Sequence, residues 1–184
     1  MMLPDLYLMR HGQTQWNAMG RLQGILDSPL TPLGITQAHR QATLLKGIGG
    51  ICLSSPQGRA VQTAAIAFQG RGWSVEPRLS EIGIGIFAGR QVVDLRKRYP
   101  KIFTGDALDW YDRCPEGEGL DALRARCTEF LDGTDQTTII ITHGLTLAML
   151  LSVATGTRLA NIGQNHMQQG CIYRLSSGTI DQLV

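Results

Sequence analysis

Short apolar runs alternate with amphipathic stretches along most of this chain. Runs at residues 6–9, 51–54 and 137–142 are rich in apolar or β-branched side chains, which is typical of buried strands. Weaker strand patterns lie at residues 75–77 and 171–175. Apolar positions at helical spacing predict helices at residues 32–46, 58–68, 91–98, 120–131 and 144–154. This alternation favours an α/β fold, with a mostly parallel central sheet inside a three-layer α/β/α sandwich.

Two long connections interrupt the alternation. Residues 12–32 are rich in Gly, Gln and Asn and contain the turn sequence Asp27-Ser28-Pro29. Residues 101–119 carry several glycines and a proline and follow no regular period. Long loops in compact domains often carry function. We expect one domain spanning residues 1–184, with residues 90–119 forming a cap or lid insertion.

The composition narrows the class of protein. The 184 residues are 43% hydrophobic, enough for a substantial core, and the formal net charge is only +2. A nucleic-acid-binding chain would show a pronounced basic stripe. No apolar run reaches the ~18 residues of a membrane span, and the first residues do not resemble a secretory signal. We expect a cytoplasmic protein that binds neither nucleic acid nor membrane.

The four cysteines, at positions 52, 114, 127 and 171, show no C-x-x-C spacing. That spacing is typical of zinc sites and redox motifs. In a reducing compartment cysteines stay as thiols, and free thiols are among the most buried side chains. We therefore expect four reduced and mostly buried cysteines.

Two of the predicted strands end in the same way, one in Arg10-His11-Gly12 and the other in Thr142-His143-Gly144. If both strands are parallel neighbours, their histidines emerge at the same edge of the sheet, where α/β proteins bind ligands. A glycine after each histidine would let the backbone approach a ligand closely. A single histidine at a strand end is more often structural, but two at matching positions favour a functional site.

The segment L-M-R-H-G-Q-T-Q-W-N, residues 8–17, resembles the R-H-G-x-T-x-x-N signature of the histidine phosphatase superfamily. That superfamily includes cofactor-dependent phosphoglycerate mutases and many small phosphatases. Residues 30–38, 54–64 and 142–144 resemble its further motifs in the same order. The resemblance covers nearly the whole chain, is weaker at residues 90–118, and implies a phosphoglycerate mutase-like fold.

The resemblance implies roles that chemistry justifies separately. His11 would be the nucleophile and would form a covalent phosphohistidine, for which its imidazole must be neutral. Adjacent arginines should lower its pKa by charge repulsion. Arg10 and Arg59 would bind the phosphate, because guanidinium groups match phosphate oxygens in pairs. His143 would be a third phosphate contact, protonated when phosphate is bound.

Glu81 is the candidate general acid and base implied by the family pattern. A leaving alkoxide needs a proton, and the phosphohistidine then needs an activated water. The alternative is that Glu81 is a surface carboxylate and that Asp94 or Glu76 does this work. Two arginines and a histidine would supply the positive charge that a metal gives elsewhere. We expect no cofactor and no metal, since a site built on the two histidines lacks a third ligand at recognisable spacing.

The loop after the first strand holds further candidates. Family position suggests that Asn17, Gln23 and Gly24 touch phosphate or substrate, whereas Thr14 could equally cap the loop. Trp110-Tyr111, in the expected cap, could stack on an apolar or aromatic leaving group. Two more histidines, His39 and His166, lie outside any motif and are expected to be structural.

Three classes of function remain open. The first is a phosphomonoesterase for small phosphate esters, resembling bacterial broad-specificity or α-ribazole phosphate phosphatases. The second is a phosphoglycerate mutase, but residues 82–85 read I-G-I-G where mutases carry an arginine and a tyrosine after the glutamate. A phosphoprotein or phosphohistidine phosphatase is a variant of the first class. The third is a non-catalytic binding module, which the complete residue set disfavours.

The partner expected from these classes is a small-molecule phosphate monoester, with a homodimer as a candidate assembly. We expect the leaving group to be determined by the segment in which the resemblance to the family is weakest. The family motif P-x-G-E-S reads P-E-G-E-G at residues 115–119, so Gly119 stands where serine is usual. That change would weaken a hydrogen bond in the loop or accompany a different leaving group.

Overall fold

A computed structural model describes residues 3–165 and 167–184 of the chain. Its sheet has the strand order β3-β2-β4-β1-β5-β6. Strands β1 to β4 run parallel, and β5 and β6 are antiparallel additions at one edge. The strands are β1 (Leu6–Arg10), β2 (Ile51–Ser54), β3 (Trp73–Val75), β4 (Thr138–Thr142), β5 (Ile172–Ser176) and β6 (Thr179–Leu183). The mostly parallel sheet expected from the sequence is confirmed.

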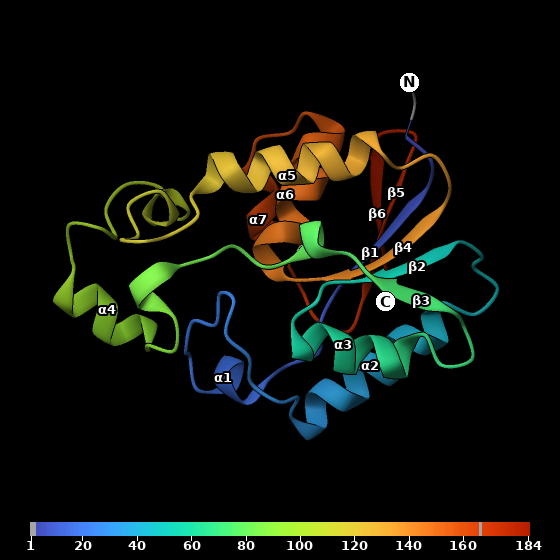
Figure 1. Cartoon of the computed structure of the whole chain (residues 1–184), viewed down its shortest axis with the longest axis horizontal. Helices are drawn as coiled ribbons and strands as arrows, with labels where there is room; N and C mark the ends of the chain where they lie inside the picture. Colours follow the sequence, from blue (N-terminus) through green and yellow to red (C-terminus); the bar gives the residue numbers. More distant parts are fainter. Residues whose placement is uncertain (1–2, 166) are drawn as a thin grey trace.

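Helices cover both faces of this sheet. In Figure 1, α2 and α3 lie on one side of it, and α5, α6 and α7 lie on the other. The helices are α1 (Gln15–Ala18), α2 (Pro32–Leu44), α3 (Gly58–Ala67), α4 (Val92–Arg98), α5 (Leu120–Asp132), α6 (Gly144–Thr155) and α7 (Leu159–Asn165). Single 3₁₀ turns are η1 (Pro77–Leu79), η2 (Gly85–Phe87) and η3 (Asp109–Tyr111). The α/β/α sandwich is therefore confirmed.

Three elements were not predicted. The one-turn helix α1 is too short to show a period, and α7 follows α6 closely. The strand expected at residues 171–175 is not the last one, because β6 follows it. β6 is a half-exposed edge strand of sequence T-I-D-Q-L, so it lacks the apolar run of a buried strand. The strand expected at residues 75–77 ends earlier, since Pro77 opens η1.

The core lies on both sides of the two central strands. All five residues of β4 are buried. Leu8 and Ile140 pack with the α5–α6 side, whereas Met9, Ile139 and Ile141 pack with the α3 side. This alternation of side chains follows from the pleat of a strand. Apolar packing on both faces fixes the positions at which the central strands end.

The cysteines and the helices bear on what the sequence predicted. All four cysteines are free and buried, as expected. Within residues 3–165 and 167–184, none of the helices combines the length and the apolar character that crossing a bilayer requires.

The two strands that end in histidines are parallel neighbours, which is the condition under which the histidines share one edge of the sheet. In the parallel ladder of β1 and β4, Arg10 is paired with Thr142, and His11 N donates a hydrogen bond to Thr142 O at 2.9 Å. The next residue on each strand is a histidine. His11 and His143 therefore emerge side by side, with ring centroids 5.1 Å apart.

The glycines after these histidines allow close contacts within the protein. A Cβ on Gly12 would lie 2.3 Å from Gly34 O, so Gly12 allows the loop after β1 to pack against the start of α2. A Cβ on Gly144 would lie 3.4 Å from Arg10 Cζ. Gly144 thus makes room for the Arg10 guanidinium above the first turn of α6.

Replacing Gly12 with alanine should therefore destabilise the fold. The new methyl group has backbone as its neighbour, which cannot swing away, and overpacking of this kind costs about 1–3 kcal/mol. Urea denaturation would measure the loss. Gly49→Ala is the matched control, because nothing lies within 4 Å of a Cβ at Gly49. Equal midpoints for the two variants would contradict this account of the loop.

The segment just before α5 forms a hydrogen bond with the residues that follow Glu81. Glu118 accepts hydrogen bonds from Gly83 N at 2.9 Å and from Arg126 Nε at 2.6 Å. Gly119 has φ 79°, a region that favours glycine, and Leu120 N donates to Asp112 Oδ1 at 2.6 Å. Asp112 thus satisfies the first backbone amide of α5, while Gly119 itself provides no side-chain cap.

Candidate active site

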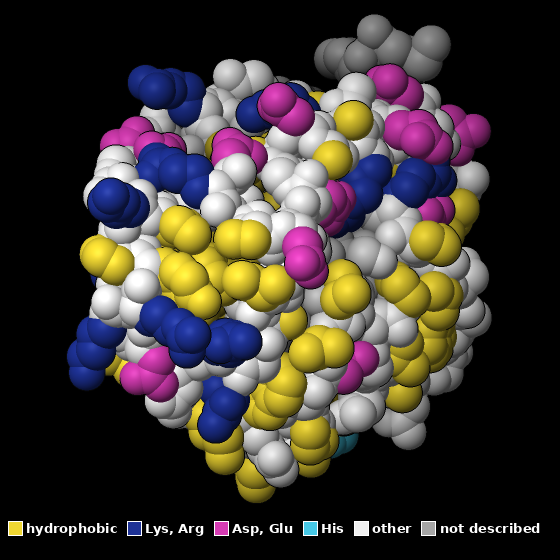
Figure 2. Space-filling view, turned by 60° about the vertical axis from the view of Figure 1, so that its left-hand side comes forward, with side chains coloured by type: hydrophobic (Ala, Val, Ile, Leu, Met, Phe, Trp, Pro, Cys, Tyr) yellow, Lys and Arg dark blue, Asp and Glu magenta, His cyan; other side chains and the backbone are white. Residues whose placement is uncertain are grey.

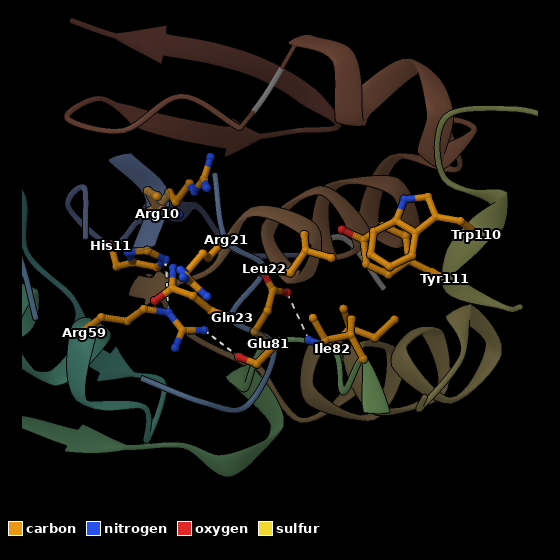
Figure 3. Close-up of a pocket in the computed structure, with 13 residues that line it drawn as sticks. Arg10, His11, Arg21, Leu22, Gln23, Arg59, Glu81, Ile82, Trp110 and Tyr111 are labelled. Atoms are coloured by element: carbon orange, nitrogen blue, oxygen red, sulfur yellow. Dashed lines mark hydrogen bonds between the residues drawn. The ribbon is translucent and has the colours of Figure 1, made fainter. Parts of the chain in front are cut away.

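A cavity of about 120 Å³ opens at the carboxyl ends of β1 and β4. The cavity is formed by segments that are far apart in the sequence, and Figure 3 draws the residues that line it. Its lining residues are Arg10, His11, Asn17, Arg21, Leu22, Gln23, Gly24, Arg59, Glu81, Ile82, Ile84, Trp110 and Tyr111. Seven of the eight site residues expected from the sequence are among them. The eighth, His143, is fully buried beside His11.

Two hydrogen bonds fix the orientation of the His11 ring, so that Nε2 is directed toward Arg59. Its Nδ1 lies 2.7 Å from Gly12 O, a partner that can only accept, so Nδ1 carries the proton. Nε2 therefore carries the lone pair and accepts a hydrogen bond from Arg59 Nε at 3.3 Å. Burial first, then Arg10 and Arg59, lower the pKa of His11 well below its ordinary value. The lowering expected from the arginines is present, but burial is the larger cause.

Asp27 fixes Arg59 in this position. Arg59 Nη1 donates to Asp27 Oδ1 at 2.9 Å and to Leu26 O at 2.6 Å, and Nη2 donates to Gly24 O at 2.8 Å. The same carboxylate accepts from the backbone N of Gly58 at 2.6 Å and of Arg59 at 3.2 Å. Asp27 thus caps α3 and orients the guanidinium. From the sequence it was interpreted only as part of a turn.

Arg10 is a half-buried cation with few partners, and its Nε atom is buried. Its Nη1 donates to Met167 O at 2.8 Å, whereas Nε has no hydrogen-bond partner in the described part of the chain. No carboxylate of the described residues forms an ion pair with it. Burial lowers the pKa of Arg10, and the nearby Glu81 opposes this. A buried charge without a counter-ion is costly, so this position suits an anionic ligand.

The side chain of Glu81 lies against the first turn of α6. Its carboxylate accepts hydrogen bonds from Ile82 N at 3.0 Å, Thr146 N at 3.2 Å and Thr146 Oγ1 at 3.1 Å. Leu145 N donates to its other oxygen at 3.3 Å. These bonds hold the side chain at the wall of the cavity, where Figure 3 places it between His11 and Tyr111.

The two alternatives to Glu81 lie elsewhere. Glu76 forms an ion pair with Arg78 at 2.8 Å, and the Glu76 side chain caps η1. Asp94 lines a different cavity. Of the three carboxylates weighed from the sequence, Glu81 is the one that lines the cavity with His11.

His143 lies behind His11 and does not line the cavity. Its Nε2 is 2.6 Å from Ser55 Oγ and 2.8 Å from Gln57 Oε1, and Ser55 Oγ also bonds Gln57 Oε1. Its Nδ1 has no partner among the described residues. Burial first, then Arg59, lower the pKa of His143 well below its ordinary value. The protonated form expected with phosphate therefore depends on the negative charge of a ligand.

The loop residues divide between structure and cavity. Thr14 caps α1, and Asn17 completes a capping box by accepting from Thr14 N at 3.1 Å. Asn17 also lines the cavity, as do Gln23 and Gly24. Gln23 is buried, and its Oε1 has no partner in the described part of the chain. The loop thus contains both a residue that caps a helix and residues that line the cavity.

The two histidines outside the motifs do not enter the site. His39 is exposed on α2. His166 lies outside the described residues.

Aromatic side chains from residues 90–119 form the wall opposite Arg10. Trp110 and Tyr111 stack with ring centroids 3.8 Å apart, and both line the cavity (Figure 3). Burial and the nearby Glu81 raise the pKa of the Tyr111 hydroxyl, so it stays protonated at neutral pH. Arg21 is a further lining residue that no motif indicated, because it sits in a loop of no regular pattern.

The depressed pKa values of His11 and His143 give the fold a pH dependence. The unfolded chain protonates both imidazoles below about pH 6.5, whereas the folded chain does not, so stability is lost as pH falls. Each group should cost about 1 kcal/mol between about pH 6.5 and about pH 5.5. Urea midpoints measured across this range should fall less in His11→Gln than in the wild type. His39→Gln, at an exposed position, should retain the wild-type slope; the reverse order would contradict the assignment.

The fold and the cavity together define an α/β protein with two histidines and two arginines at the carboxyl edge of a parallel sheet. Within the described residues, no cluster of three His, Cys, Asp or Glu could hold a metal ion. The family model described as "Histidine phosphatase superfamily (branch 1)" matches residues 6–180. The chain belongs to this superfamily.

Relatives within the superfamily carry more than one name. The chain is 36% identical over 170 residues to "Probable phosphoglycerate mutase GpmB" of Yersinia pestis, covering 83% of this chain and 75% of the relative. It is similar to the crystal structure of the α-ribazole phosphatase from Shigella flexneri, with a TM-score of 0.82, 26% identity and 97% and 95% of the two chains covered. Bacillus stearothermophilus YhfR aligns with a TM-score of 0.81, 29% identity and 97% and 94% coverage.

Proposed function

We propose that the protein is a phosphomonoesterase that hydrolyses small phosphate esters through a phosphohistidine on His11. The observation that carries this proposal is the half-buried Arg10 guanidinium, which has a buried Nε without a partner and no carboxylate partner among the described residues, and which lies beside a neutral imidazole. A phosphate group would neutralise Arg10 and Arg59 together. It would also lie against the lone pair of His11 Nε2.

In the first step, His11 Nε2 attacks phosphorus. The Nε2–P bond forms, the P–O bond to the leaving group breaks, and the acid form of Glu81 gives its proton to the departing oxygen. Arg59 presents Nε toward His11, because Asp27 and Leu26 engage Nη1 and Gly24 O engages Nη2. Charge on the transferred group is thereby stabilised by two guanidinium groups.

In the second step, water replaces the histidine. The Glu81 carboxylate takes a proton from water, the resulting oxygen attacks phosphorus, and the Nε2–P bond breaks to release inorganic phosphate. Gly12 O holds Nδ1–H throughout, so the imidazole leaves in the tautomer in which it attacked. His143 assists through Nδ1, which takes up a proton when the phosphate charge raises its pKa.

The lining after Glu81 favours hydrolysis over mutase chemistry. Ile82 and Ile84 are buried and line the cavity, at positions where a mutase carries cationic and phenolic contacts. We take residues 90–119 as a cap, since Trp110 and Tyr111 close one side of the cavity. An aromatic leaving group would stack on these rings.

A panel of phosphate monoesters tests the proposal. It includes p-nitrophenyl phosphate, α-ribazole 5′-phosphate, and 3-phosphoglycerate with and without a bisphosphoglycerate primer, each with and without EDTA. We expect release of inorganic phosphate, unaffected by EDTA. Transfer of phosphate to give 2-phosphoglycerate, with little hydrolysis, would support the mutase instead. No release from any ester would overturn both enzymatic assignments.

A further inference from the structure

The Gln57 side chain is directed into the protein and not onto the helix that it precedes. Gln57 is the N-cap residue of α3, yet its side chain makes no capping hydrogen bond. The backbone N of Gly58, at the start of that helix, is bound by Asp27 instead. The Gln57 amide is therefore available to His143, whose Nε2 lies 2.8 Å from Gln57 Oε1.

The position of the proton on His143 follows from the two oxygens beside its ring. Gln57 Oε1 can only accept a hydrogen bond. Ser55 Oγ has a single proton, which it donates to Gln57 Oε1, while the backbone N of Gln57 donates to Ser55 Oγ at 3.4 Å. Neither oxygen can therefore donate to Nε2, although they lie 2.6 Å and 2.8 Å from it. Nε2 must carry the proton, so the lone pair of the neutral ring is on Nδ1.

This hydrogen-bonded group is closed off from solvent. Ser55 and His143 are fully buried, and Gln57 is 8% exposed. Figure 2 accordingly shows hardly any histidine on the face of the molecule that it presents. The two oxygens thus determine which ring nitrogen is protonated. Nδ1 has no partner among the described residues, so it is the ring atom that remains for a further proton.

The charges around His143 explain why a neutral acceptor suits this position. Burial lowers the pKa of His143, and so do four nearby cationic or titratable groups, those of Arg59, His11, Arg10 and Arg126. A bound phosphate would oppose these charges, and Nδ1 would then take up a proton from water. Gln57 Oε1 can accept from Nε2 before and after that step. A carboxylate could also accept, but its negative charge would repel the phosphate.

We propose that Gln57 is a positioning residue of the active site, which holds His143 with a proton on Nε2 and leaves Nδ1 to become protonated when phosphate binds. The inference rests on the proposed function, since it gives His143 its role toward a bound phosphate. Gln57 acts through His143 and is not one of the residues that line the cavity.

The ¹⁵N NMR spectrum of the histidine rings tests this placement of the proton directly. In the free wild type at about pH 7, we expect a proton on Nε2 of His143 and a lone pair on Nδ1. The signals are assigned by their loss in His143→Gln. With saturating inorganic phosphate, both nitrogens should be protonated. A lone pair on Nε2 in the free protein would mean that the amide nitrogen of Gln57 faces the ring, and would overturn the proposal.

Two variants of Gln57 separate positioning from packing. Gln57→Met keeps the length of the side chain but loses the acceptor oxygen, so the proton should be shared between Nε2 and Nδ1. We expect about a tenfold loss in affinity for inorganic phosphate and in kcat/KM on p-nitrophenyl phosphate. Gln57→Glu keeps an acceptor and should retain the proton on Nε2, although its charge weakens phosphate binding. Gln69→Met, at an exposed position just after α3, is the matched control and should behave as the wild type.

The outcomes distinguish this inference from the proposed function. An unchanged proton position in Gln57→Met, or a changed one with wild-type phosphate affinity and turnover, would overturn the role of Gln57. If Gln57→Met does not fold, Gln57→Glu decides, because loss of the Nε2 proton in that variant would contradict the proposal. If the wild type binds phosphate with both His143 nitrogens protonated but hydrolyses no ester, the proposed function fails while the placement of the proton holds.

Discussion

His11→Ala should lose at least about 10⁴-fold in kcat on every phosphate monoester that the wild type hydrolyses. The imidazole of His11 lines the cavity, and its Nε2, which carries the lone pair, lies 3.3 Å from Arg59 Nε. Without it no phosphohistidine forms, and direct attack by water must replace two easier steps. The measurement is steady-state release of inorganic phosphate.

The fold must be shown to survive this substitution. Circular dichroism and a urea midpoint at pH 8 serve as the check, since the imidazole is neutral there in both the folded and the unfolded chain. His39→Ala, at an exposed position on α2, is the matched control and should retain full activity. Turnover by folded His11→Ala within tenfold of the wild type would refute the covalent mechanism.

Glu81→Gln should lose about 10²–10⁴-fold in kcat on alkyl phosphates, because both proton transfers are removed. The loss should take a different form on p-nitrophenyl phosphate. Its leaving anion needs no proton, so phosphate transfer to His11 stays fast while attack by water becomes slow. We therefore expect a burst of p-nitrophenol stoichiometric with enzyme, followed by a slow steady rate, in stopped-flow absorbance.

A control and a contrary outcome sharpen this test. Glu129→Gln, an exposed glutamate on α5, should behave as the wild type. A uniform slow rate with no burst would mean that Glu81 only supports the first turn of α6. Its hydrogen bonds with Leu145 N and Thr146 would then be its whole role.

The fold and the centre of the site were accessible from the sequence because they depend on local signals. Short apolar runs ending in R-H-G and T-H-G indicated that His11 and His143 would share one edge of the sheet if their strands were parallel neighbours. The structure supplies that pairing, with Arg10 opposite Thr142. Arg59 was predicted from the resemblance of residues 54–64 to a motif of the family, and it lies in the first turn of α3.

The supporting contacts were not accessible, since they join residues that are distant in the chain. Asp27 meets Arg59 across 32 positions, and Gln57 meets His143 across 86. Neither residue has a period or a spacing that reveals its partner. The order of the two histidines, with His11 at the cavity and His143 behind it, depends on how α6 packs, which is a tertiary property.

Direct detection of phosphohistidine tests the central claim. The wild type is mixed with a phosphate monoester, quenched in alkali within the first turnover, digested and analysed by mass spectrometry. We expect phosphate on the peptide that contains His11, stable in alkali and lost in acid. Phosphate on a serine or an aspartate, or full turnover with no phosphorylated peptide at any quench time, would contradict the assignment of His11 as the nucleophile.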